Sequence, residues 1–306
     1  MKKSIDLAVY YIARIAFCLV QALSVDMCMR LAAPIIWIAV DILKIRADVV
    51  DENLRHAFPG MGPAARRRLA RRHWEHLALM MVEILHARRK IHLTNWRDYV
   101  CFRNKRALVR TLLERRPHVV VSGHYGNFEI GAMIVGMFGF PMFTIARPLD
   151  NRYLDRFING CRSAYGLQVL QKKGSADDAA DLLSRGGSLL VLGDQAAGPK
   201  GCWVNFFGRE ASTHKAISVF SLSFNAPMVV TYTKRHQQPM MFEIGGEAIA
   251  DPDVDTDVCG GVRELTTWFS NHIENVIRRD PYQYWWAHRR WKGKRPQRRR
   301  RPRNAA

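Results

Sequence analysis

The sequence predicts an α/β fold in which a parallel or mixed sheet is flanked by helices. From about residue 117 onward, short apolar runs alternate with helix-like stretches, which is typical of such a sheet. A polar residue follows closely on several of these runs, as expected where parallel strands end at one edge of a sheet. The amino end differs, because two apolar runs there favour membrane-associated helices ahead of the sheet.

Composition and charge narrow the class of protein. The 306 residues carry 47 Lys and Arg against 27 Asp and Glu, a net charge of +20, and 48% are hydrophobic. These values exclude a largely disordered chain and a polytopic membrane protein. The six cysteines form no Cys-x-x-Cys pair, which argues against a zinc ribbon or a disulfide-stapled fold and indicates a reducing compartment. The charge favours anionic partners: nucleic acid, acidic lipid or a phosphorylated substrate.

Residues 1–45 are expected to form membrane-associated helices. Residues 7–25 are nearly all apolar, and as a helix they would extend about 28 Å, close to one hydrocarbon core. Arg14 argues against a simple span, since a charged side chain at mid-membrane costs at least ~2.5–3.5 kcal/mol. The second run, 31–40, is too short to span alone. A marginal span, two helices lying in the interface and an ordinary core helix remain as alternatives.

Residues 46–291 are expected to form the main domain. A long helix is predicted from Pro63 to about Arg89, which contains no internal Gly or Pro. Its arginine-rich front half suits either a solvated face or lipid headgroups. The further predictions are strands at 118–122, 142–146, 188–192 and 228–232, and helices over 128–138, 150–165, 175–185, 211–224 and 262–279.

A basic tail follows at 292–306, with eight Lys and Arg residues and no acid. Arginine and proline dominate it and it has no apolar run, so disorder is expected. The tail serves either as a solvating segment or as a means of docking to an anionic surface.

Three polar residues from distant segments follow predicted strands. His124, Arg147 and Asp194 each come just after an apolar run. Because ligands bind beyond the carboxyl ends of strands in open α/β sheets, the three are expected at one edge.

His124 and Glu129, in the segment HYGNFE, are the most informative pair. On one continuous helix they would lie ~140° apart, so a bend is required, and Gly126-Asn127 supplies one. Asn127 is expected to cap the next helix and place Glu129 in its first turn. The carboxylate would then orient the imidazole, which could take a proton from a substrate hydroxyl as general base.

HYGNFE resembles the H-x4-D/E signature of the lysophospholipid-acyltransferase superfamily, and more narrowly that of the lipid A biosynthesis acyltransferases. Further segments match that branch in order, from about residue 5 to residue 292. They are Asn53-Leu54 with 57–59 (AFP), 146–151 (ARPLDN) with Arg162, 193–195 (GDQ), 205–208 (NFFG) and 282–291 (YQYWWAHRRW).

The resemblance implies a glycerol-3-phosphate-acyltransferase-like fold and transfer of a fatty acyl group from a thioester to a hydroxyl of a lipid A precursor or related glycolipid. His124 would be the base and Glu129 its partner. Arg162, or else Arg147, would bind phosphate or support the oxyanion. The other substrate-site residues would be Asp194, Asn127 and Gln195.

The implied co-substrate is acyl carrier protein or coenzyme A loaded with a fatty acid, without a cofactor or metal. The implied location is the cytoplasmic face of the bacterial inner membrane. A different phospholipid or glycolipid acceptor is an alternative. A nucleic-acid binder would explain the charge but not the apolar amino end or the H-x4-E corner. A serine hydrolase is disfavoured because there is no G-x-S-x-G elbow. A membrane-surface scaffold without catalysis stays open.

Overall fold

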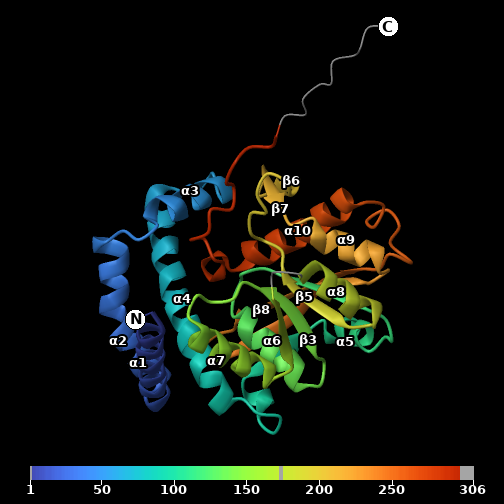
Figure 1. The fold of residues 1–306 in the computed structure, drawn as a ribbon. Coiled ribbons are helices and arrows are strands. Elements are labelled where there is room, and N and C mark those ends of the chain that lie inside the picture. The colour runs from blue at the N-terminus through green and yellow to red at the C-terminus, as the bar shows by residue number, and fades with distance from the viewer. Residues whose placement is uncertain (1, 172–174, 297–306) are drawn as a thin grey trace.

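A seven-stranded sheet forms the centre of the computed structural model, which describes residues 2–171 and 175–296 (Figure 1). Its strand order is β1-β9-β8-β2-β5-β3-β4. The strands from β8 to β4 run parallel, whereas β9 is antiparallel to β8 and parallel to β1. The strands are β1 (Val100–Arg103), β2 (His118–Ser122), β3 (Met142–Ala146), β4 (Leu167–Gln171), β5 (Ser188–Leu192), β8 (Met228–Arg235) and β9 (Phe242–Ala250).

Helices cover both faces of the sheet. They are α1 (Lys2–Ala22), α2 (Val25–Trp37), α3 (Ala47–Ala57), α4 (Pro63–Lys90), α5 (Lys105–Leu112), α6 (Phe128–Met137), α7 (Arg152–Ser163), α8 (Ser175–Ser184), α9 (Ala216–Ser223) and α10 (Val262–Arg279). Three short helical turns, η1 (Ile38–Ile42), η2 (Trp96–Asp98) and η3 (Pro281–Gln283), complete the helical elements of the described ranges.

Side chains of β2 alternate between the two faces, as in any strand. Val119 and Val121 pack into the core cluster under α8, α9 and α10. Val120 packs instead with Ala132 of α6 in a smaller cluster on the opposite face. The strand is buried throughout because both faces are covered, which explains its continuous apolar run.

Most of the predicted elements are confirmed. The strands β2, β3 and β5 have the predicted bounds, and α4 and α10 match the predicted helices within a residue. The helix predicted over 211–224 is wrong at its start, because Arg209–Thr213 is a strand, β7, which pairs with β6 (Cys202–Phe206). Phe207 and Gly208 join these strands with φ of 53° and 76°, the positive values that a tight two-residue hairpin turn requires.

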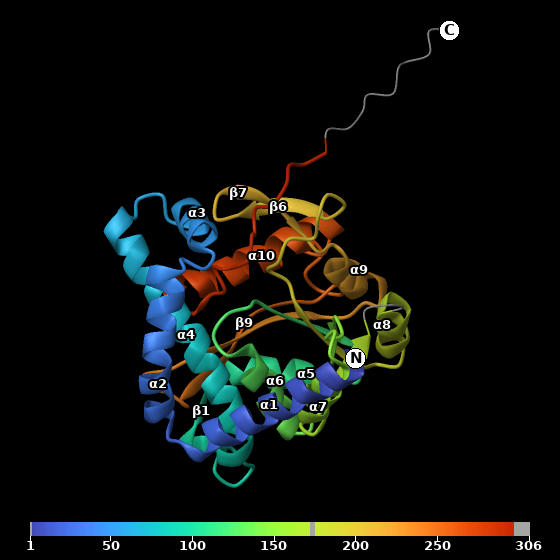
Figure 2. The same cartoon turned by 60° about the vertical axis from the view of Figure 1, so that its left-hand side comes forward.

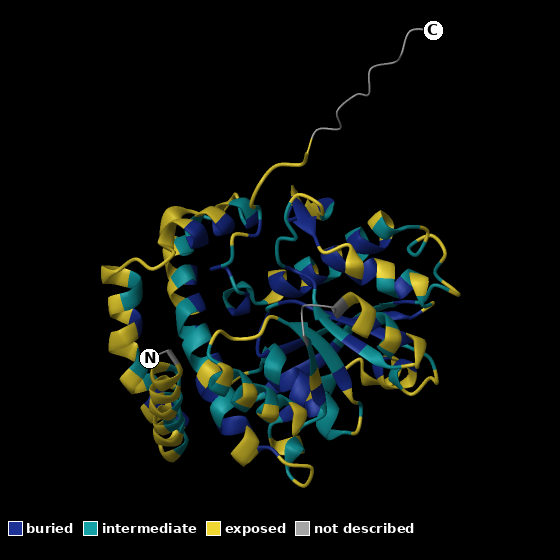
Figure 3. Cartoon of the chain, in the orientation of Figure 1, coloured by how far each residue is buried: buried dark blue, intermediate teal, exposed yellow. Residues whose placement is uncertain are grey.

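The amino-terminal helices lie on the outside of the protein. Among the described residues, 23 large hydrophobic side chains are exposed, and 16 of them lie between residues 5 and 45. Figure 3 shows α1 and α2 largely exposed beside a sheet whose strands are buried or intermediate. The window within α1 that is long and apolar enough to cross a membrane has no buried residue, which argues against the core-helix alternative. This apolar surface suits a membrane.

Helix α1 packs against the domain through one side only. In Figure 2 it crosses in front of α6 and α7, and it contacts both α7 and α4. Tyr10 and Phe17 meet Phe157 of α7 on this side. Arg14 also faces the protein, with its guanidinium carbon 4.4 Å from the ring centroid of Phe157. The charge of Arg14 therefore points away from the apolar outer face, so that this face could contact a membrane without placing Arg14 in lipid.

The predicted disordered tail at 292–306 falls mostly outside the described residues, which end at 296. The division of the chain at residues 45 and 291 stays a prediction.

Candidate active site

His124 and Asp194 meet because their strands are neighbours in register. In the β2–β5 pair, Ser122 lies opposite Leu192. Each strand is followed by a glycine and then by the functional residue, so equal offsets bring His124 and Asp194 together. Nδ1 of His124 lies 2.8 Å from Oδ1 of Asp194, whose side chain is buried. Both residues lie at one edge of the sheet, as expected, but their direct contact was not predicted.

The carboxylate that contacts His124 is thus Asp194, not the predicted Glu129. Glu129 lies in the first turn of α6, as expected, but it pairs with Arg162 of α7. The Arg162 guanidinium donates from Nε to Oε2 over 3.0 Å and from a terminal nitrogen to Oε1. A bidentate pair of this kind occupies both carboxylate oxygens, so Glu129 is held by Arg162 rather than by the imidazole.

The electrostatics of the His124–Asp194 pair favour an ionised Asp194 and a basic His124. Burial lowers the pKa of His124, but the charge and hydrogen bond of Asp194, with a smaller effect of Glu129, outweigh it and raise the pKa above 6.5. Burial raises the pKa of Asp194, but His124 and two backbone hydrogen bonds bring it below its ordinary value. Burial and Asp194 together raise the pKa of the Tyr284 phenol, which is hydrogen-bonded to that carboxylate and stays protonated.

The second ring nitrogen of His124 is directed to a different partner. Nε2 lies 3.2 Å from Nε2 of Gln195. With the Nδ1 proton donated to Asp194, Nε2 is an acceptor, so the amide of Gln195 occupies the place that a substrate hydroxyl would take. The ring packs edge-on against Phe128 and Trp285, with centroids 5.2 Å and 6.0 Å away.

Gly126 allows the backbone to turn between β2 and α6. Its φ is +59°, and a Cβ there would lie 1.8 Å from the carbonyl oxygen of Thr233, so a larger residue does not fit. The backbone N–H groups of Gly126 and Asn127 donate to the carbonyls of Gln283 and Thr233, over 2.9 Å and 2.8 Å. These bonds fix the turn that follows His124.

Asn127 does not cap α6 with its side chain, contrary to expectation. The side chain is buried, and its Nδ2 donates to Oε2 of Glu83 over 3.1 Å and to the carbonyl of Met80. Glu83 is fully buried in α4 and also accepts two bonds from Arg235. Asn127 therefore anchors the turn to α4, and it does so from within the core rather than from the substrate side.

A groove of about 740 Å³ runs past His124. Its walls come from α1, α4, α6 and α7, and His124, Glu129 and Arg162 all line it. Most of the lining is apolar; Phe17, Met80, Met81, Ile84, Met133 and Phe157 are examples. The arrangement combines a basic imidazole with space for an apolar chain.

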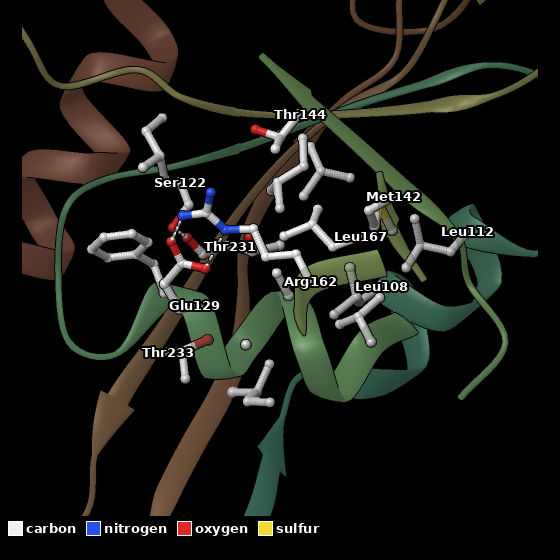
Figure 4. A pocket seen from close by; sticks show the side chains of 18 residues that line it. Leu108, Leu112, Ser122, Glu129, Met142, Thr144, Arg162, Leu167, Thr231 and Thr233 are labelled. Atoms are coloured by element: carbon white, nitrogen blue, oxygen red, sulfur yellow. Dashed lines mark hydrogen bonds and ion pairs between the residues drawn. The ribbon is translucent and has the colours of Figure 1, made fainter. Parts of the chain in front are cut away.

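A smaller cavity of about 120 Å³ lies behind the Glu129–Arg162 pair, between α5, α6 and the sheet. Figure 4 shows that pair beside Ser122 and Thr231, with Leu108, Leu112 and Met142 deeper in the cavity. Glu129 and Arg162 line both spaces, so the ion pair stands where groove and cavity meet.

Arg147 is not part of this arrangement. It follows β3 as predicted, but its side chain is 78% exposed and pairs with Asp150 over 3.8 Å. It lines a separate surface hollow, which Arg162 also borders. Among the predicted arginines, only Arg162 lines the His124 groove.

The segment 282–291 covers the turn that carries His124, a role that the sequence does not predict for it. The N–H of Trp285 donates to the carbonyl of His124 over 3.0 Å, and Tyr284 reaches Asp194 as described above. Asn53 of α3 holds this segment by donating to the carbonyls of Trp286 and His288, each over 2.7 Å. His288, in turn, accepts from the N–H of Ala196, next to Gln195. Within residues 2–171 and 175–296, no group of three His, Cys, Asp or Glu side chains is placed to hold a metal ion.

Comparison with known proteins adds a family to this geometry. The E. coli (strain K12) lipid A biosynthesis lauroyltransferase is 24% identical over 261 residues, covering 83% of this chain and 82% of its own. The palmitoleoyltransferase of the same organism is 24% identical over 258 residues, covering 82% and 80%. A crystal structure of a 1-acyl-sn-glycerophosphate acyltransferase from Thermotoga maritima aligns with a TM-score of 0.43 and 12% identity, over 86% of this chain and all of the other.

The family model of the bacterial lipid A biosynthesis acyltransferases matches residues 1–293, nearly the whole chain. The protein therefore belongs to that family and is an acyltransferase.

Proposed function

We propose that this protein transfers a fatty acyl group from an acyl thioester to a hydroxyl of a lipid A precursor, with His124 as general base and Asp194 as its carboxylate partner. The observation that carries the proposal is the imidazole held by a buried carboxylate on the wall of an apolar groove. Membership of the family supports the acceptor, since the curated relatives are named for lipid A biosynthesis.

The chemistry follows from the two ring nitrogens. The acceptor hydroxyl displaces Gln195 from Nε2 of His124 and gives that nitrogen its proton as its oxygen bonds to the thioester carbonyl carbon. Asp194 stabilises the imidazolium that forms. Collapse of the tetrahedral intermediate breaks the carbon–sulfur bond, and the leaving thiolate recovers the proton from His124. The remaining Arg162 nitrogen, bonded only at 3.5 Å to Asn159, is free to stabilise the oxyanion.

The two apolar spaces provide for the acyl chain. The groove is lined mainly by hydrocarbon side chains, and each buried CH₂ contributes ~0.8 kcal/mol to chain binding. The cavity behind Glu129 and Arg162 would receive the end of the chain past Leu167 and Leu192, which line both spaces, while the ion pair stays in place.

Acyl carrier protein is the proposed donor carrier, because it is acidic and the front half of α4 is basic. Arg67 and Arg68 of α4 have no acidic partner within the described residues, so their charge is available to a protein partner. The exposed apolar face of α1 and α2 would rest in the membrane that contains the lipid acceptor, which we propose to be the cytoplasmic face of the inner membrane.

The direct test is mass spectrometry of a reaction that contains purified protein in neutral detergent, a lipid A precursor and acyl carrier proteins loaded with fatty acids of different length. The expected product is the precursor with one additional acyl group, and its mass identifies the chain. Parallel reactions with acyl coenzyme A compare the donors, and reactions with a glycerophospholipid test the alternative acceptor. Absence of an acylated lipid A precursor with every donor would contradict the proposal.

Glu129→Gln and Arg162→Gln are each expected to reduce kcat by about 10- to 100-fold, because each removes half of the pair that positions the oxyanion donor. The kcat of the double variant is expected to be no lower than that of the slower single variant, since both changes disrupt the same ion pair. Steady-state kinetics of the four proteins measures this coupling.

If the fold-loss in kcat of the double variant equalled the product of the two single-variant losses, that result would contradict the pairing. It would mean that Glu129 acts on His124 independently of Arg162, as the sequence predicted. Asp181→Asn is a matched control, since it removes an exposed acid of α8 that pairs with Arg185 one turn away and lines neither the groove nor the cavity, and its kcat is expected to equal that of the wild type.

A further inference from the structure

The His124 groove is lined by three arginines that have no role in the proposed reaction. Arg14 comes from α1, whereas Arg88 and Arg89 come from the last turn of α4. With Arg162 and a single acid, Glu129, they give the groove lining a net charge of +3. An otherwise apolar groove thus carries an excess of positive charge.

None of these three guanidinium groups has a carboxylate within 4.0 Å among the described residues, unlike Arg162. Arg14 donates to the Tyr10 hydroxyl over 3.1 Å, Arg88 to Sγ of Cys161 over 2.8 Å and Arg89 to the Gln21 carbonyl over 3.2 Å. Each guanidinium has five N–H donors, so these neutral contacts hold the side chains in place and leave most donors available.

The three arginines lie beside the surface that suits a membrane. Ile12, Ile15 and Leu19, on the outer face of α1, are each more than 60% exposed. Arg14 lies on the opposite face of the same helix, toward α7 and the groove. If the outer face of α1 rests in lipid, the three cations lie next to the headgroup layer, where the polar part of a membrane lipid is found.

We propose that Arg14, Arg88 and Arg89 form a binding site for a phosphate group of the acceptor lipid. The inference rests on the proposed function and names a recognition element for its acceptor. A phosphate monoester matches the charge, and guanidinium groups bind phosphate oxygens in bidentate fashion. The acceptor is favoured over the donor because Arg14 belongs to the helix that contacts the membrane, whereas a carrier protein approaches from water.

The first experiment measures binding without turnover. The full chain in neutral detergent is titrated calorimetrically with 1-lauroylglycerol 3-phosphate and, separately, with 1-lauroylglycerol, which lacks only the phosphate. We expect tighter binding of the phosphorylated lipid, and a loss of at least about tenfold in the triple variant Arg14→Gln/Arg88→Gln/Arg89→Gln, as expected when several charge-assisted bonds are removed.

The matched control is Arg106→Gln/Arg110→Gln/Arg115→Gln, which removes the same charge from exposed positions in and after α5 that do not line the groove. Its binding of the phosphorylated lipid is expected to equal that of the wild type. Equal loss in both triple variants would show only nonspecific attraction and would overturn the site. Circular dichroism and the conservative variant Arg14→Lys/Arg88→Lys/Arg89→Lys, which should retain part of the binding, separate lost contacts from lost folding.

The second experiment compares KM values. The groove variant is expected to raise KM for a phosphorylated lipid A precursor by at least about tenfold, to leave KM for the dephosphorylated precursor unchanged and to leave KM for the thioester donor unchanged. A rise in KM for the thioester donor alone would assign the arginines to a phosphate group of the donor and overturn the proposal. Phosphate-dependent binding without any acyl transfer by the wild type would instead refute the proposed reaction and leave the site standing.

Discussion

His124→Ala is expected to lower kcat for acyl transfer by about 10³- to 10⁴-fold, since it removes the base that accepts the proton of the attacking hydroxyl. The groove and its arginines stay in place, so KM for the acceptor should change little. The measurement is initial rates of lipid acylation by purified protein. Retention of near wild-type turnover would exclude His124 as the base and would mean that another group accepts the proton of the hydroxyl.

A suitable control is His92→Ala, because His92 is an exposed histidine in the loop after α4 that does not line the groove. Its kcat should match that of the wild type. Flotation with vesicles should show equal membrane association for both variants and the wild type, since α1 and α2 are unchanged.

The order of strands explains which parts of the site sequence could predict. Each strand is specified locally, so the sequence predicts the strands at 118–122 and 188–192 with the bounds that the structure has. Their adjacency in the sheet depends on contacts between segments 70 residues apart and cannot be derived from either run alone. Sequence reasoning therefore placed His124 and Asp194 at one edge but chose Glu129, the nearest acid in the chain, as the partner of the imidazole.

A signal for the correct pair was present in the sequence. The segments VSGH and VLGD each follow an apolar strand with a glycine and then a functional residue. Equal offsets from two strands predict contact only if the strands are neighbours, so the signal becomes specific only with the sheet topology. The same limitation applies to Arg147, which follows a strand as expected but is 78% exposed and lies outside the groove.

Other differences arise from surroundings that a single segment does not reveal. Asn127 has the residue type and position of a helix cap, but the buried Glu83 of α4 competes for its side chain. Arg14 is unfavourable in an isolated apolar helix and acceptable in one whose inner face meets Phe157. The strand β9 was not predicted, since Gly245 and Gly246 interrupt its apolar pattern.

Asp194→Asn is expected to reduce kcat by about 10³- to 10⁴-fold, nearly as much as the loss of His124 itself, because an amide favours the wrong tautomer and does not stabilise the imidazolium. The variant should also change the pH dependence. The base must be neutral, so kcat/KM of the wild type rises with pH through the raised pKa of His124, above the ordinary 6.5. Without the Asp194 charge, burial dominates and the pKa of His124 falls, so the acidic limb of the profile moves to lower pH.

Glu129→Gln provides the decisive comparison for this pH profile. The effect of Glu129 on the pKa of His124 is weaker than that of Asp194, which both attracts the imidazole and bonds to it. The acidic limb of the Glu129→Gln variant should therefore stay close to that of the wild type even though its kcat is reduced. A larger shift in Glu129→Gln than in Asp194→Asn would show that Glu129 orients the base during turnover, and that the pairing seen between Asp194 and His124 is not the catalytic one.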